Sequence, residues 1–187
     1  MEFFRAQLAR AMEHQRVQTS AFTEWYLVNL LSVWVKGAEV PQPEGGFDCT
    51  PLSLLYVRAL RASRLERARL LRLLGDTALL VSGFFADSLP GRPAGLGYYR
   101  AMGGRAYACL GHEGSAALAP AVFQELADRF VEFVDLLQEV SEESRVGAPH
   151  SVLRLYERWL ETGSRRAAAL LAREGIVPAL PGADKVQ

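Results

Sequence analysis

The segment GLGYYRAMGGRAYACLG, residues 95–111, decides the fold that we expect for this chain. It carries a small residue at every third or fourth position: Gly97, Ala101, Gly104, Ala108 and Gly111. This spacing places all five on one face of a helix, where another backbone can approach closely. Glycine inside a helix costs about 1 kcal/mol relative to alanine, and close packing would account for three glycines on one face. We therefore predict a helix over residues 95–111 that packs tightly against a neighbour.

The preceding segment, residues 73–89, supplies a matching series of small residues. These are Gly75, Ala78, Ser82 and Ala86. We predict that the two series face each other in an antiparallel helix pair. The Gly75-Asp76 pair could interrupt a helix over residues 64–88, because glycine can end one helix and aspartate can cap the next. A continuous helix is the alternative that we favour.

Helical periodicity extends along most of the chain, and no run of alternating β-branched residues indicates a sheet. The remaining helices are predicted at residues 2–17, 22–35, 51–62, 120–146, from 149 onward, and 164–175. Short connections between such helices favour an all-α, single-domain antiparallel helical bundle of about seven or eight helices. We assign residues 1–178 to this helical domain and residues 179–187 to a flexible C-terminal tail.

Several helix ends carry recognisable signals. Ser20 and Ser164 stand where an N-cap is expected, and Ser63 with Glu66 forms a capping box. Pro51 suits the first position of a helix, where a backbone N–H is not needed. Residues 22–35 are apolar around most of the helix, so we expect this helix to be buried.

The composition describes a globular protein of one domain. The 187 residues are 50% hydrophobic and 22% charged, with a formal net charge of zero, so no overall field attracts nucleic acid or an anionic membrane. Two cysteines form neither a metal motif nor a disulfide framework, and the N-terminal segment lacks the apolar core of a secretory signal. We expect a cytoplasmic protein without a membrane span, since residues 22–35 are too short for one.

Sequence motifs for metal, cofactor or nucleophile chemistry are missing. The three histidines lie far apart, and none forms a pair at the spacing of helical metal sites. The glycines near residue 97 lack the strand and the third glycine of a dinucleotide fingerprint. The sequence therefore predicts neither a metal, a cofactor nor a catalytic residue.

Asp76 is the most informative polar residue, because it lies within LLRLLGDTALLVSGFF, residues 70–85, where an unpaired charge would be expensive to bury. In one interpretation it is a helix cap or a buried hydrogen-bond partner. In the other it binds a ligand or handles a proton. The partners that we expect from the following helix form a candidate ligand site with it: Tyr98, Tyr99, Arg100 and Tyr107. Glu24 in the apolar helix is a second candidate of the same kind.

Charge is concentrated in two segments of opposite sign. Residues 58–72 contain six arginines and one glutamate, a local net charge of +5, whereas residues 125–143 contain seven acids and one arginine, a net of −6. We favour pairing of the two segments, within the chain or between copies. Solvated faces are one alternative, and nucleic-acid binding by the arginines is another that we do not favour.

The run GDTALLVSGFFADSL followed by YYRAMGGRAYACL resembles a pattern of an uncharacterised family of bacterial all-helical proteins. The matching residues are Gly75, Asp76, Ser82, Gly83, Phe84, Phe85, Tyr98, Tyr99, Met102, Gly103, Ala106 and Tyr107. The resemblance covers about a fifth of the chain. It implies a shared helical core in a bacterial protein and no known activity.

Two hypotheses for function follow. The first is a non-catalytic, oligomeric helical binding or regulatory protein, with a homodimer favoured and with a further protein as a possible partner. The second is a bundle with an internal pocket for a small apolar ligand between the helices at 64–88 and 95–111. One form of this second hypothesis is an enzyme that uses Asp76, Tyr98 and Tyr99.

Overall fold

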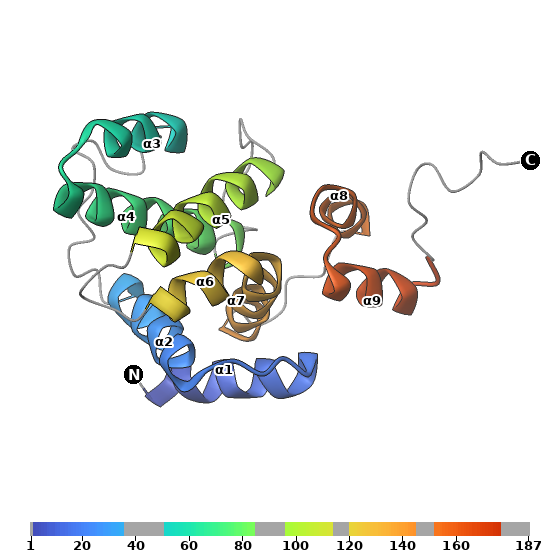
Figure 1. The fold of residues 1–187 in the computed structure, drawn as a ribbon. Coiled ribbons are helices and arrows are strands. Elements are labelled where there is room, and N and C mark those ends of the chain that lie inside the picture. Colours follow the sequence, from blue (N-terminus) through green and yellow to red (C-terminus); the bar gives the residue numbers. More distant parts are fainter. Residues whose placement is uncertain (1, 36–50, 85–95, 114–119, 145–151, 177–187) are drawn as a thin grey trace, which may run out of the picture.

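The computed structural model describes residues 2–35, 51–84, 96–113, 120–144 and 152–176, and within these ranges every regular element is a helix (Figure 1). The helices are α1 (Glu2–Gln15), α2 (Ala21–Val35), α3 (Leu52–Arg61), α4 (Arg64–Ser82), α5 (Leu96–Glu113), α6 (Pro120–Asp128), α7 (Phe130–Ser144), α8 (Val152–Thr162) and α9 (Arg165–Arg173). This confirms the all-α class. The expected tail at 179–187 lies outside the described residues.

Helices α4 and α5 pack against each other at the centre of the molecule, but not through the small residues that the sequence analysis placed between them. A Cβ atom at Gly103 would lie 2.7 Å from the Cβ of Ala78, so Gly103 is the α5 glycine that lets α4 approach. Gly104 and Gly111 face α6 instead: their nearest neighbours are Ala127 and Gln124. The prediction of two facing stripes is therefore wrong for α5.

Gly75 and Gly97 also do not pack in the way that the facing stripes predicted. The aromatic ring of Tyr107 occupies the space beside Gly75, where an added Cβ would lie 2.6 Å from a ring carbon. Nothing lies within 4 Å of the position that a Cβ would take at Gly97. The face of α4 that carries small residues thus accommodates a large side chain of α5, rather than another small residue.

Helix α4 runs without interruption through Gly75 and Asp76, as we favoured from the sequence. It ends at Ser82, and the backbone N–H of Gly83 donates to the carbonyl of Leu79. The part of the predicted helix beyond residue 84 lies outside the described residues. Ser63 is the N-cap residue of α4, but its side chain makes no capping hydrogen bond, so the predicted capping box is not formed as expected.

The helix predicted over residues 120–146 is divided at Arg129 into α6 and α7, which point in different directions (Figure 1). The backbone N–H of Arg129 still donates to the carbonyl of Glu125. Apolar residues continue on both sides of the division, and Phe123, Leu126, Phe130 and Phe133 are all buried. The change of direction lets one apolar sequence cover α5 first and then α1 and α4.

Helix α1 lies along α7 and buries Phe4, Leu8 and Ala11. The connection to α2 begins with Arg16, a non-glycine residue with a φ of 55°. The hydroxyl of Ser20 then accepts from the backbone N–H of Thr23, which confirms the predicted N-cap of α2.

Helices α8 and α9 form a hairpin with a small core of its own, made of Leu155, Trp159, Ala167 and Leu171. The predicted cap is confirmed, because the Ser164 hydroxyl accepts from the backbone N–H of Ala167. Gly175 follows α9 with a φ of +79°, a conformation that favours glycine. In Figure 1 the hairpin lies to one side of the other helices.

Candidate functional site

Asp76 lies at the meeting point of three helices. Its Oδ1 atom accepts a hydrogen bond of 2.5 Å from the hydroxyl of Tyr26 on α2 and one of 2.8 Å from the hydroxyl of Tyr107 on α5. Both tyrosines are buried. One carboxylate oxygen thus joins α2 and α5 to α4, which is the buried hydrogen-bond role considered from the sequence.

Arg72 neutralises this carboxylate from one helical turn earlier. Its Nε atom lies 3.6 Å from Oδ2 of Asp76, and its guanidinium carbon lies 5.2 Å from the centre of the Tyr26 ring. A cation over an aromatic face is attracted by the negative charge density of the ring. Arg72 therefore contacts two members of the cluster, which we call the Asp76 cluster: Asp76, Tyr26, Tyr107 and Arg72.

Burial sets the proton equilibria of this cluster. Loss of hydration raises the pKa of Asp76 above its ordinary value, although the hydrogen bonds from Tyr26 and Tyr107 and the charge of Arg72 act in the opposite direction. Burial and the nearby carboxylate raise the pKa of both tyrosines well above the ordinary value. Burial lowers the pKa of Arg72, but its interactions with Tyr26 and Asp76 outweigh this, so that pKa is raised too. Both tyrosines therefore remain hydrogen-bond donors at neutral pH.

Aromatic rings fill the space around Asp76. The ring of Phe123 on α6 stacks on Tyr107 at 6.0 Å and meets the edge of Tyr26 at 5.7 Å. Tyr107 itself occupies the space beside Gly75. The side chain of Asp76 is only 15% exposed. The arrangement binds α2, α4, α5 and α6 together, and its polar atoms are directed at one another.

Two of the other expected site residues point elsewhere. The Tyr98 hydroxyl accepts from the backbone N–H of Ser53, at the start of α3, at 2.9 Å. The Arg100 guanidinium donates to the carbonyl of Thr162, at the end of α8, at 3.1 Å. Tyr99 contacts the ring of Tyr98 edge-on. Of the four partners proposed for Asp76, Tyr107 is the one whose hydrogen bond to it we observe.

The sequence analysis missed Tyr26 and Arg72. Arg72 could have been found, because residues four apart lie on one side of a helix. Tyr26 had no such signal, since 50 positions separate it from Asp76.

Glu24, the second candidate, lies near the surface: its carboxylate is 3.9 Å from the guanidinium of Arg5, and its side chain is 30% exposed. An exposed pair of this kind contributes little to stability.

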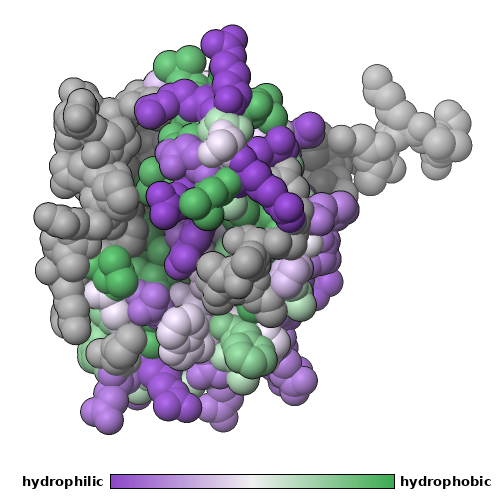
Figure 2. Space-filling view, turned by 60° about the vertical axis from the view of Figure 1, so that its left-hand side comes forward, coloured by the Kyte–Doolittle hydropathy of each residue, from purple (hydrophilic) through white to green (hydrophobic). Residues whose placement is uncertain are grey.

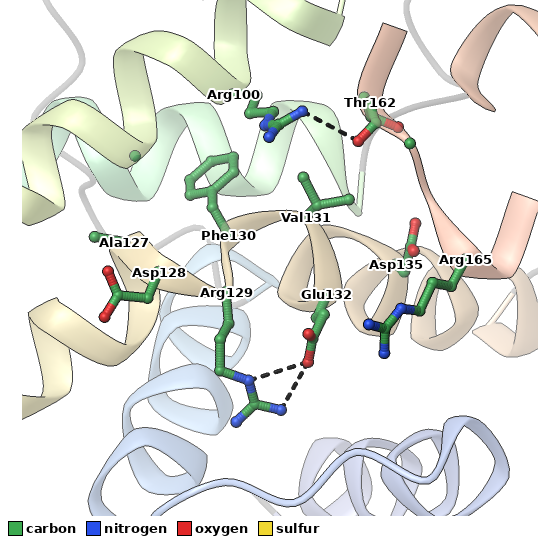
Figure 3. Close-up of a pocket in the computed structure, with 12 residues that line it drawn as sticks. Arg100, Ala127, Asp128, Arg129, Phe130, Val131, Glu132, Asp135, Thr162 and Arg165 are labelled. Atoms are coloured by element: carbon green, nitrogen blue, oxygen red, sulfur yellow. Dashed lines mark hydrogen bonds and ion pairs between the residues drawn. The ribbon is translucent and has the colours of Figure 1, made fainter. Parts of the chain in front are cut away.

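A groove of about 260 Å³ lies at the junction of α5, α6, α7 and the α8–α9 hairpin (Figure 3). Arg100 is the expected site residue that lines it. Several charged groups around it have partners: Arg100 bonds Thr162, Arg129 bonds Glu132, and Asp135 accepts from Ser164. Arg100 and Asp135 thus hold the hairpin beside the groove, whereas Arg129 and Glu132 pair with each other.

Asp135 is the buried anchor of that hairpin. Both of its carboxylate oxygens accept from the hydroxyl of Ser164, at 2.8 and 2.7 Å. Burial raises the pKa of Asp135. The hydrogen bond from Ser164 and the charges of Arg158 and Arg166 partly offset this increase. Arg166 on α9 also pairs with Glu139 and Glu142 of α7. The hairpin thus docks on α7 through polar groups rather than through its small core.

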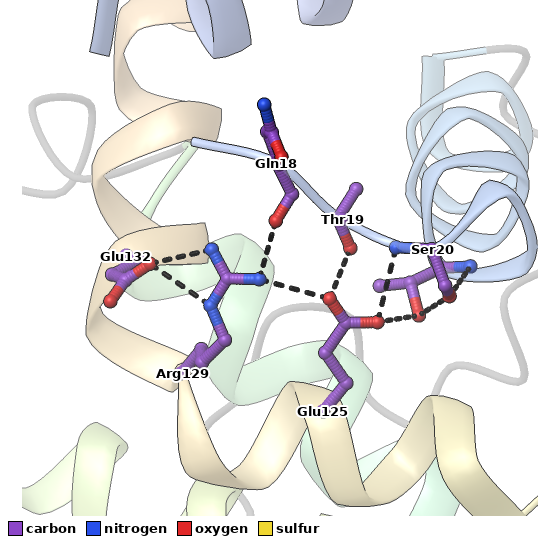
Figure 4. A network of polar contacts seen from close by, with 7 residues as sticks. Gln18, Thr19, Ser20, Glu125, Arg129 and Glu132 are labelled. Atoms are coloured by element: carbon purple, nitrogen blue, oxygen red, sulfur yellow. Dashed lines mark hydrogen bonds and ion pairs between the residues drawn. The ribbon is translucent and has the colours of Figure 1, made fainter. Parts of the chain in front are cut away.

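A second polar network joins α6 to the segment before α2 (Figure 4). The carboxylate of Glu125 accepts from the hydroxyls of Thr19 and Thr23 at 2.6 and 2.8 Å, and it also pairs with Arg129 at 3.0 Å. Burial alone would raise the pKa of Glu125, but the hydrogen bonds from the hydroxyl groups outweigh it and lower that pKa. Arg129 donates further to the carbonyl of Gln18.

The structure shows no ion pair between the two charged segments among the contacts of its described residues, and pairing between copies stays a prediction. The acids at 125–142 are satisfied by other partners, chiefly Arg129 and Arg166, with His14 2.8 Å from Glu139. The arginines of α3 and of the first part of α4 are mostly exposed. The observed partners of the acidic segment are therefore Arg129, Arg166 and His14 of the same chain.

Within the part of the chain that the structure describes, no cluster of three or more metal-ligating side chains occurs. In the same part, no helix has both the length and the apolar character needed to cross a membrane. Comparison of the sequence with protein-family models, with curated proteins and with solved structures finds no match.

Proposed function

We propose that this chain is a non-catalytic helical binding or regulatory protein that acts as a homodimer, and that two copies meet through the outer face of α2. The observation that carries the proposal is a line of four residues on this helix, which we call the α2 stripe: Phe22, Trp25, Asn29 and Val33. Phe22 is 71% exposed and Trp25 is 56% exposed. Large aromatic side chains that protrude together from one helix are typical of interface centres.

The spacing of the α2 stripe supports a helix as its partner. Residues at i, i+3, i+7 and i+11 lie along one side of a helix, as in the seam of a coiled coil. The opposite side of α2 is turned inward, with Tyr26, Leu27, Leu30 and Leu31 buried. We expected from the sequence that this helix would be buried, and that expectation is wrong on the side that carries Phe22 and Trp25.

The chemistry of the α2 stripe supports a second copy of the chain as the partner. The stripe carries no charge, and the formal net charge of the whole chain is zero, so two copies do not repel each other. Asn29 lies in the middle of the stripe, and an amide both donates and accepts hydrogen bonds, so it can pair with the same residue of another copy. A single asparagine among apolar residues often sets register in paired helices.

The non-catalytic part of the proposal is supported by the Asp76 cluster. A general acid or base must reach a substrate, whereas Oδ1 of Asp76 holds two tyrosine hydroxyls and Arg72 lies beside Oδ2. Phe123 fills the adjoining space. These contacts favour a binding protein over the alternative of a small-molecule pocket between α4 and α5. We further propose a bacterial, cytoplasmic protein, which the sequence resemblance and the low cysteine content support.

Self-association is tested by sedimentation velocity at micromolar concentration. The parent chain should have about twice the 20.6 kDa mass of one copy. Replacement of Phe22 and Trp25 by serine should give a folded monomer, as checked by circular dichroism, because it removes the apolar centre of the contact. The matched control is Leu153→Ser with Leu160→Ser, which alters exposed apolar residues on α8 and should leave the dimer intact.

Two results would contradict the proposal. A parent chain that is monomeric at low and at high salt would exclude the dimer. A dimer that persists in the Phe22→Ser, Trp25→Ser variant, or that is lost in the α8 control, would place the contact on another face.

A further inference from the structure

The outer face of α3 and the first turn of α4 combine exposed apolar side chains with arginines, and the α2 stripe does not explain them. On the inner side of α3, Leu52, Leu55 and Ala59 are buried. The opposite side carries Leu54, Val57 and Leu60, and α4 begins with Leu65, which is 68% exposed. We call these four residues, with Arg58 and Arg61, the α3 surface. An ordinary surface helix presents polar residues on this side.

The charge of this region has one sign. Helix α3 contains no acidic residue, and both Arg58 and Arg61 are exposed. The single acid in the neighbouring part of α4 is Glu66, which lies 4.0 Å from Arg69 in an exposed pair. Arg58 and Arg61 therefore give the outer side of α3 a local positive charge.

The α3 surface is held in place by two hydrogen bonds to α5. The backbone N–H of Ser53 donates to the Tyr98 hydroxyl at 2.9 Å, and Nε of Arg105 donates to the Tyr56 hydroxyl at 3.0 Å. These bonds and the buried inner side of α3 give the helix a defined orientation. Figure 2 shows hydrophobic and hydrophilic side chains next to each other on the upper part of the molecule, where α3 lies.

We propose that the α3 surface docks on an anionic lipid bilayer. A helix lying in the plane of a membrane inserts apolar side chains among the acyl chains while its arginines contact lipid phosphates, and their long stems allow both at once. Leu54, Val57, Leu60 and Leu65 are the inserting side chains. Arg58 and Arg61 are the headgroup contacts.

The alternatives fit these residues less well. A nucleic-acid surface of this charge would be expected to interleave aromatic side chains for base stacking, and the exposed apolar residues here are aliphatic. An acidic protein partner would match the arginines, but it would also need an apolar surface against which the four aliphatic side chains could pack. A bilayer supplies both kinds of contact.

The experiment is co-sedimentation of the full chain with vesicles, at low and at physiological salt. Vesicles of phosphatidylglycerol mixed with phosphatidylcholine should bind the protein, and phosphatidylcholine alone should bind it weakly. Each basic residue near such a surface contributes roughly fivefold to partitioning, so Arg58→Gln with Arg61→Gln should lower it roughly 30-fold. Leu54→Ser with Leu60→Ser should lower it roughly tenfold or more, because the insertion is lost.

Matched controls come from the α8–α9 hairpin. Arg165→Gln removes an exposed arginine of α9, and Leu153→Ser removes an exposed leucine of α8, so neither should change partitioning. Equal binding to neutral and anionic vesicles, or no binding to either, would overturn the proposal. It would also be overturned if the arginine variant lost binding to a DNA oligonucleotide while its lipid partitioning stayed unchanged. The test is independent of the dimer, since the α2 stripe and the α3 surface share no residue.

Discussion

Two adjacent glycines of α5 give the sharpest test of how the central helices pack. A Cβ atom added at Gly103 would lie 2.6 Å from the ring of Phe130 and 2.7 Å from the Cβ of Ala78. A Cβ atom added at Gly104 would have the carbonyl oxygen of Ala127 as its nearest neighbour, at 3.9 Å. The variants Gly103→Ala and Gly104→Ala therefore make the same chemical change in two different surroundings.

The expected magnitudes follow from these distances. Each substitution gains about 1 kcal/mol of helix propensity. Gly104→Ala should keep that gain, because 3.9 Å is an ordinary contact. Gly103→Ala should also lose about 1 to 3 kcal/mol through overpacking, because the Cβ of Ala78 is attached directly to the α4 backbone and cannot rotate away. The propensity gain cancels between the two variants, so their difference in unfolding free energy measures the overpacking alone.

Urea denaturation of the parent and both variants at the same protein concentration provides the measurement. Gly103→Ala should be less stable than Gly104→Ala by about 1 to 3 kcal/mol. Equal stabilities would show that Gly103 is not where α4 and α5 approach each other. A lower stability of Gly104→Ala would restore the facing stripes predicted from the sequence and refute the packing described above.

Three further predictions concern the polar clusters and are read from unfolding free energies as a function of pH. Because the pKa values of Tyr26 and Tyr107 are raised in the fold, the free energy of unfolding should be constant below pH about 10 and fall above it by roughly 1.4 kcal/mol per pH unit for each tyrosine. Tyr26→Phe should halve this tyrosine-dependent slope. Asp76→Asn should lower the free energy of unfolding by about 1 to 2 kcal/mol. The loss should be larger at pH 3 than at pH 7, because the raised pKa of Asp76 makes the parent chain more stable when the carboxyl is protonated. An unchanged stability with altered loading of a co-purified molecule would instead favour a ligand site. Glu125→Gln should lower the free energy of unfolding by about 1 kcal/mol at pH 7, and by less as the pH falls below about 4. The reason is that the network lowers the pKa of Glu125 and so stabilises the fold only while the carboxylate is charged. A loss of stability that does not depend on pH would contradict the network.

Local signals in the sequence predicted most helices and several of their ends. Ser164 caps α9, Ser20 caps α2, and α4 continues through Gly75 and Asp76 as we favoured. These features depend on residues within one or two helical turns, which a sequence displays directly. The division at Arg129 had no such signal, because neither glycine nor proline lies there and the apolar pattern continues across it.

Residue spacing predicts which residues share a helix face, but not which neighbour that face meets. The small residues of α5 do share a face, yet Gly104 and Gly111 lie against α6, while Gly103 and Tyr107 lie against α4. The same limit applies to the Asp76 cluster. Asp76 was identified because a charge within an apolar helix needs a partner, but Tyr26 comes from a helix 50 positions away, and only the fold brings it there.

The buried cluster and the proposed interface are connected through the rotation of α2. Successive residues of a helix are about 100° apart, so Trp25 must point well away from its neighbour Tyr26. The hydrogen bond from Tyr26 to Asp76 holds Tyr26 inward, and Trp25 is thereby held outward with Phe22. A polar contact in the core can therefore determine which side of a largely apolar helix is presented to a second copy. In the proposed dimer, Asp76 would act on the contact through the orientation of α2, without touching the second copy.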